Sequence, residues 1–170
     1  MLKNRQQLGI GHVCYEIERL CECYERWLAL QSRRAAQREM NDLIELVLLH
    51  ARAVLDFFEH SGNFKKTKCN KGDTDDDIVA DHYEWPARKI RIDRKVKTRI
   101  NKEIAHLSYF RCGLTKEEKT WHFATFVPIL LRQSREFLIH VDTRFAAELP
   151  SLELRIVQKC IPMLKKYENA

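Results

Sequence analysis

Apolar residues recur at steps of three and four along most of this sequence, and this spacing constrains the fold more than any other feature. Residues three and four positions apart share one face of an α-helix, so each such run predicts an amphipathic helix with one buried side. Residues that break helices are rare, with five glycines and four prolines among 170 residues. We therefore expect an all-α protein, and the length fits a single helical domain over residues 1–170.

Five stretches carry the helical spacing. The predicted helices cover residues 10–30, 35–60, 87–111, 115–145 and 151–167. The second is apolar on most of its sides and should lie at the centre of the fold. Short joints between amphipathic helices favour an antiparallel four- to five-helix up-and-down bundle. Pro128 should kink the fourth helix, and the last stretch fits either a short fifth helix or an arm that reaches a second subunit.

Residues 61–86 interrupt the helical pattern. They contain a basic run, then Gly72 and an acidic run from Asp73 to Asp77. Opposite charges side by side around a glycine are typical of a solvated loop, and the ligand spacing of an EF-hand is missing. We expect a polar excursion here, with a short helical turn near residues 77–83.

The net charge of +6 permits an anionic partner such as nucleic acid without requiring one. The six cysteines form no CxxC pair, and the Asp73–Asp77 run joins no His or Glu at metal-ligand spacing. Cys14 and Cys21 lie seven residues apart on an apolar face, which favours reduced thiols in the core. We therefore expect no metal and no other cofactor.

No apolar run approaches the roughly 18 residues of a membrane-spanning helix. The N-terminal segment MLKNRQQLGI also lacks the apolar centre of a signal peptide. We therefore expect a cytoplasmic protein with no membrane partner.

The stretch RINKEIAHLSYFR, from Arg99 to Arg111, combines polar residues with an apolar stripe. In a helix, Arg99, Glu103 and His106 lie along one edge of that stripe. The residues around it are strongly basic, and we expect Arg91, Arg94, Lys95 and Lys102 to be the residues that contact a nucleic acid, if one binds. This basic face is either ordinary solvated surface or a track for phosphates, and the sequence leaves both interpretations open.

Asp56 is conspicuous in the second helix because its neighbours are mostly Leu and Val. Arg52, four residues earlier, could pair with it along the helix. Alternatively, Asp56 reaches a neighbouring helix, where Arg99 or His106 would be its partner.

The pattern of Arg99, a polar Asn101 and then His106 resembles the motif of the HEPN superfamily. In that motif an Arg and a His are separated by four to six residues in the last part of an antiparallel helical bundle. The segments HARAVLDFF, DDIVAD and NKEIAH followed by LSYFR, together with Trp85, extend the similarity over scattered parts of residues 44–111. The resemblance implies a HEPN-like bundle. Such proteins are commonly metal-independent endoribonucleases of toxin–antitoxin or defence systems, commonly homodimers, and some have a cognate protein partner.

The residue types suit RNA cleavage. Histidine can act as acid or base near neutral pH, and a guanidinium can donate to two phosphate oxygens of the transition state. A two-fold dimer would bring Arg99 and His106 of both subunits to one cleft, with Asn101 orienting the phosphate or the imidazole. Glu103 could orient His106 or neutralise Arg99.

Two other interpretations remain open from the sequence. Arg99, Glu103 and His106 could form an ion network that only connects helices. The chain could also be a non-catalytic helical interaction module that binds a nucleotide or a protein partner through the same groove.

Overall fold

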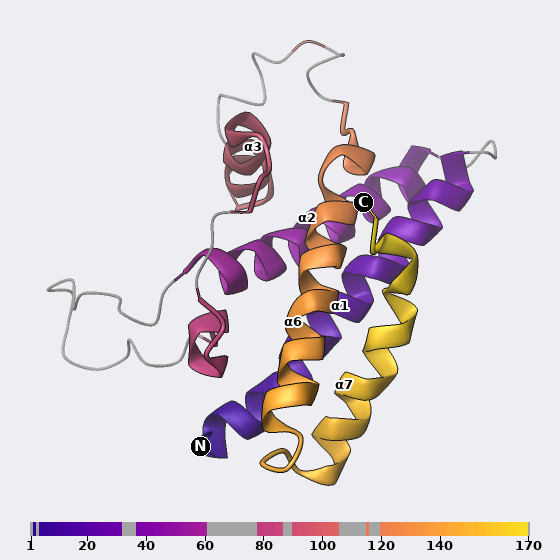
Figure 1. The fold of residues 1–170 in the computed structure, drawn as a ribbon. Coiled ribbons are helices and arrows are strands. Elements are labelled where there is room, and N and C mark those ends of the chain that lie inside the picture. The colour runs from indigo at the N-terminus through magenta and orange to yellow at the C-terminus, as the bar shows by residue number, and fades with distance from the viewer. Residues whose placement is uncertain are drawn as a thin grey trace, which may run out of the picture.

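The computed structural model describes residues 2, 4–31, 37–60, 78–86, 90–105, 115 and 120–169, without the side chains of residues 37 and 103–105. Within these ranges the chain forms α-helices and short 3-10 helices and no strand (Figure 1). The helices are α1 (Asn4–Gln31), α2 (Gln37–Glu59), η1 (Ala80–Tyr83), α3 (Arg94–Ala105), η2 (Phe123–Thr125), α6 (Val127–Phe145), α7 (Ser151–Met163) and η3 (Lys165–Tyr167). The prediction of an all-α bundle is confirmed for this part of the chain.

The two longest helices, α1 and α2, pack on each other more extensively than any other pair. The helices α6 and α7 lie side by side in opposite directions, and both contact α1 (Figure 1). The helix α3 packs on α2 and lies at the edge of the bundle (Figure 1). The stretch 151–167 forms α7 and η3, which pack within this same chain against α1 and α6.

The core consists of the apolar stripes that the spacing predicts. Ile10 and Ile17 of α1, Val47 of α2 and Leu138 of α6 are fully buried. At the centre, the rings of Phe57, Phe58, Tyr83 and Phe137 contact one another at centroid distances of 5.0–6.4 Å. Edge-to-face packing of this kind adds to the free energy gained by burying the rings.

The described cysteines are reduced core residues, as the sequence predicts. Free, buried thiols are present at Cys14, Cys21, Cys23 and Cys160, whereas Cys69 and Cys112 lie outside the described residues. Within the described part of the chain, no group of three His, Cys, Asp or Glu side chains could hold a metal ion. None of its helices is long and apolar enough to span a membrane.

The first helix begins earlier than the sequence suggests. It starts at Asn4 and continues through Gly9 and Gly11, whereas the spacing predicts a start at residue 10. A Cβ at Gly9 would lie 2.9 Å from Ile78 Cδ1 and 3.3 Å from the Tyr83 hydroxyl. The glycine therefore allows the segment around η1 to approach α1 closely, and Tyr83 completes this contact by donating to the Gln6 carbonyl at 2.8 Å.

Two predicted helix starts are wrong. Residues 90–93 are not helical, and α3 begins at Arg94 because Asp93 caps it: Asp93 Oδ1 accepts from the Lys95 amide at 2.6 Å. Residues 116–119 lie outside the described residues and residues 120–122 are not helical, so the fourth helix as described, α6, begins at Val127. Pro128 does not kink it, because proline in the first turn lacks only an N–H that has no intrahelical partner there.

Candidate functional site

The candidate site lies on α3, which has one side buried against the bundle and another side exposed. Ile100 is completely buried and Val96 is partly buried, and they turn toward the bundle. The exposed side carries four cations, which we call the basic face: Arg91, which precedes the helix, and Arg94, Lys95 and Lys102. Among the described residues, Arg91, Arg94 and Lys95 have no ion-pair partner. The structure thus places these four predicted residues on one exposed surface.

Lys97 belongs to the contact between α3 and α2, and not to the basic face. Its Nζ pairs with the Glu59 carboxylate and donates to the Ile90 carbonyl at 2.7 Å. The same Glu59 oxygen accepts from the Ile90 amide at 2.8 Å. Glu59, at the end of α2, therefore attaches both α3 and the segment that precedes it. The role of Glu59 could not be predicted from the sequence, because helical spacing relates a residue only to its near neighbours and its partners lie more than thirty positions later.

Arg99 lies at the opposite edge of the exposed side of α3, against an aromatic cluster. Its guanidinium carbon is 4.0 Å from the centroid of the Trp121 ring, and Nη1 donates to the Thr120 carbonyl at 3.3 Å. Trp121 in turn stacks on Phe123, with centroids 6.0 Å apart and the planes 9° from parallel. This contact was not predicted from the sequence, because Trp121 falls within the predicted helix over residues 115–145.

The other predicted site residues are only partly brought together. Asn101 is exposed on α3, but two residues correspond to about 200° of helix rotation, so it points away from Arg99. The backbone of Glu103 belongs to α3, while its side chain and the whole of His106 lie outside the described residues. The predicted proximity of Arg99 and His106 therefore stays a prediction.

Asp56 pairs with Arg52 along α2, with Arg52 Nε and Asp56 Oδ2 3.6 Å apart. Both side chains are more than one-third exposed, so this pair contributes little to the free energy of folding. Of the two alternatives for Asp56, the structure shows the partner within its own helix.

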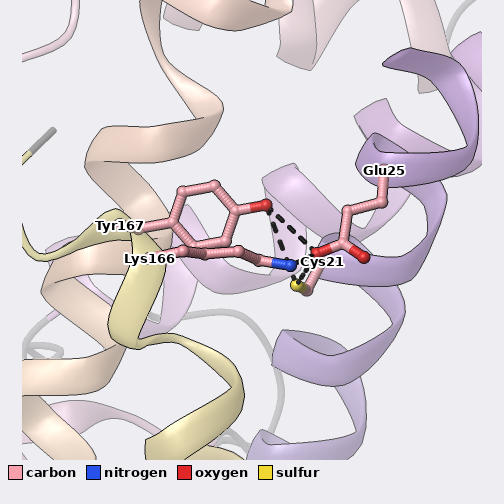
Figure 2. A network of polar contacts seen from close by, with 4 residues as sticks. All are labelled: Cys21, Glu25, Lys166 and Tyr167. Carbon is pink, nitrogen blue, oxygen red and sulfur yellow. Dashed lines mark hydrogen bonds and ion pairs between the residues drawn. The ribbon is translucent and has the colours of Figure 1, made fainter. Parts of the chain in front are cut away.

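A second polar cluster connects the C-terminal end of the chain to α1 (Figure 2). Glu25 accepts from the Cys21 thiol at 3.3 Å and from the Tyr167 hydroxyl at 3.4 Å, and it pairs with Lys166. Burial raises the pKa of both Cys21 and Tyr167. Both groups therefore keep their protons at neutral pH and act as donors, so the cluster stabilises the bundle and provides no nucleophile.

A third polar pair lies between α1 and α2. His50 is buried, and its Nδ1 is 2.7 Å from Glu16 Oε2. Nearby, His12, Glu16 and apolar residues such as Val54, Phe57 and Ile78 line a cavity of about 130 Å³. The pair provides a partner for the buried His50 side chain.

No protein-family model matches this chain, and it matches no curated protein and no solved structure. Membership of the HEPN superfamily therefore stays a prediction. The functional interpretation depends on the residues and contacts described above.

Proposed function

We propose that this chain is a HEPN-like RNA-binding protein that cleaves RNA without a metal ion, and that the RNA strand lies along the basic face of α3. The observation that carries the proposal is the basic face itself, in which Arg91, Arg94, Lys95 and Lys102 are all exposed. Phosphates are the ligands that such a surface attracts most strongly, because each contact releases condensed counterions from the nucleic acid.

The position of the cations supports binding more than it supports the stability of α3. Arg94 and Lys95 occupy the first turn, where positive charge opposes the helix macrodipole. Asp93 is the acidic residue at that end, and it caps the backbone. From Arg94 to Lys102 the helix rises roughly 12 Å, which is comparable to the length of a few nucleotides of one strand.

Arg99 and His106 would supply the chemistry at the edge of this face. In RNA cleavage the ribose 2′-hydroxyl loses a proton as its oxygen attacks the phosphorus, and the leaving 5′-oxygen gains a proton. His106 can act as base or acid, and Arg99 can donate to the phosphate oxygens on which negative charge accumulates. A homodimer would supply a second His106, so that one imidazole could act as base and the other as acid.

The test is RNA cleavage by the purified protein in EDTA, with wild type, His106→Ala and His12→Ala compared. His12 is an exposed histidine of α1 and serves as the matched control. We expect cleavage by wild type and His12→Ala, and none by His106→Ala with an unchanged melting temperature. Cleavage by His106→Ala at the wild-type rate would contradict the assignment.

The same experiment separates the non-catalytic alternative. If wild type binds RNA but does not cleave it, the chain is an RNA-binding module, and the catalytic part of the proposal is wrong. If it neither binds nor cleaves RNA, the whole proposal is wrong. A rise in melting temperature with a mononucleotide would then favour a nucleotide-binding module.

A further inference from the structure

We infer that Trp121 is a positioning residue that holds the guanidinium of Arg99 in the orientation in which it meets an RNA phosphate. The inference rests on the proposed function and deepens it, because it assigns a role to an aromatic residue outside the predicted motif.

Two adjacent residues, Thr120 and Trp121, contact the guanidinium in the described part of the chain. Its central carbon lies 4.0 Å from the Trp121 ring centroid, and Nη1 donates to the carbonyl of Thr120 at 3.3 Å. The ring lies against the central carbon of the guanidinium, and the hydrogen bond fixes the position of Nη1. Two contacts of different geometry thus define one orientation for a side chain that is otherwise flexible.

Trp121 is itself fixed by the core of the bundle. It is 8% exposed, and it packs on Phe123 and, at a centroid distance of 6.3 Å, on Phe126. Phe123 meets Trp27 of α1 edge-on at 4.9 Å. The position of the Arg99 head group is therefore set by a continuous series of rings that begins in the first helix.

This arrangement suits a phosphate-binding group. A cation–π contact is an electrostatic attraction to the ring and does not require the guanidinium to form a hydrogen bond with it. A side chain that is already ordered loses less conformational entropy when it binds a ligand. The exposed basic face begins directly beside Arg99, with Lys95 and Lys102 within one turn on either side of it along the helix.

A purely structural role would look different in an experiment. In that case Arg99 only covers the ring of Trp121, and removing the ring would lower stability without a specific effect on RNA. Phe126 is the matched control, because it is a buried ring of the same cluster that contacts Trp121.

The experiment measures the affinity of a fluorescently labelled single-stranded RNA by anisotropy, together with melting temperature, for five variants: Arg99→Ala, Trp121→Leu, Trp121→Phe, Phe126→Leu and Arg99→Ala combined with Trp121→Leu. We expect Trp121→Leu to weaken binding about two- to fivefold, the range of an exposed cation–π contact. Trp121→Phe should lie between it and wild type, because a phenyl ring retains a weaker contact. Phe126→Leu should lower the melting temperature and weaken RNA binding clearly less than Trp121→Leu does, because it leaves the ring beside Arg99 in place.

The double variant makes the test specific. If Trp121 acts through Arg99, then Trp121→Leu should cause no further loss of affinity once Arg99 is alanine. An equal loss in both backgrounds, or an effect of Phe126→Leu as large as that of Trp121→Leu, would overturn the inference. If Trp121→Leu does not fold, the same cycle with Trp121→Phe decides.

The role of Arg99 and the role of Trp121 are tested by different variants. If Arg99→Ala binds RNA as wild type does, the role of Arg99 in the proposed function is wrong. If Arg99→Ala weakens binding while neither substitution of Trp121 does, the proposed function stands and the inference about Trp121 is wrong.

Discussion

Lys97 of α3 and Glu59 of α2 form an ion pair across 38 positions of sequence, and both side chains are about four-fifths buried. The Glu59 oxygen in this pair also accepts from the Ile90 amide. The pair therefore determines where the candidate site is attached to the bundle, because it holds α3 and the segment before it on one carboxylate.

Substitution of Glu59 by Gln should destabilise the attachment of α3. We expect a loss of about 1–3 kcal/mol in the free energy of unfolding, since Lys97 is left largely buried without its counter-charge. Urea unfolding measures the loss, and faster amide exchange in α3 would locate it. The control is Asp56→Asn, which breaks the exposed pair with Arg52 and should change stability by less than about 0.5 kcal/mol. Equal effects of the two substitutions would contradict the role of Glu59.

The two glycines of α1 should respond differently to alanine. Nothing lies within 4 Å of a Cβ at Gly11, whereas a Cβ at Gly9 meets Ile78 and Tyr83. Gly11→Ala should stabilise the protein by about 0.5–1 kcal/mol through helix propensity. Gly9→Ala should be less stable than Gly11→Ala by about 1 kcal/mol, because Ile78 must move. Thermal or urea unfolding of both variants gives the difference, and identical stabilities would show that η1 does not approach α1 as described.

The cap of α3 should depend on the side-chain oxygen of Asp93 and not on its charge. Asp93→Ala should cost about 1 kcal/mol of unfolding free energy, whereas Asp93→Asn keeps an oxygen that can accept from the Lys95 amide and should cost less. Helix content by circular dichroism and urea unfolding report both effects. If Asn is no better than Ala, the carboxylate acts through its charge.

Removal of single cations from the basic face should reduce the salt dependence of RNA binding. For Lys95→Ala or Lys102→Ala, we expect the slope of log affinity against log salt concentration to fall by about 0.7 for a single strand. Arg144→Ala is the control, because Arg144 is an exposed cation of α6 that pairs with Glu84. A slope that changes equally in all three variants would indicate a general charge effect and no localised strand.

Stability should decrease at alkaline pH, with a contribution from Cys21. Burial raises the pKa of this thiol above its ordinary value of 9.0, so between the unfolded and the folded pKa the folded state binds more protons. The free energy of unfolding then falls as pH rises, by at most about 1.4 kcal/mol per pH unit for one group. Urea unfolding between pH 7 and pH 10.5 should show a shallower decline for Cys21→Ala than for wild type. Parallel curves would mean that Cys21 contributes nothing to the decline.

The all-α class and the buried stripes followed from the sequence because helical spacing is local. The spacing of apolar residues along each helix is enough to predict which positions face the core. Ile10, Ile17 and Val47 are at such positions, and all three are buried as expected. The burial of Cys14 and Cys21 follows from the same spacing. The exposed cations of α3 could also be predicted from the sequence. The sequence did not show that Lys97 differs from them by pairing with Glu59.

The contacts that place the candidate site depended on tertiary packing. Arg99 lies on Trp121 and donates to Thr120, 21 positions away. The helical spacing predicts that Trp121 belongs to the fourth helix, but that helix begins at Val127 in the structure. Similarly, Glu59 pairs with Lys97 and not with another cation of the same basic run, because the end of α2 places Glu59 beside Lys97. Local spacing determines which side of a helix is apolar, but it carries no information about which distant residue meets an exposed edge. That choice is made only when the helices pack together.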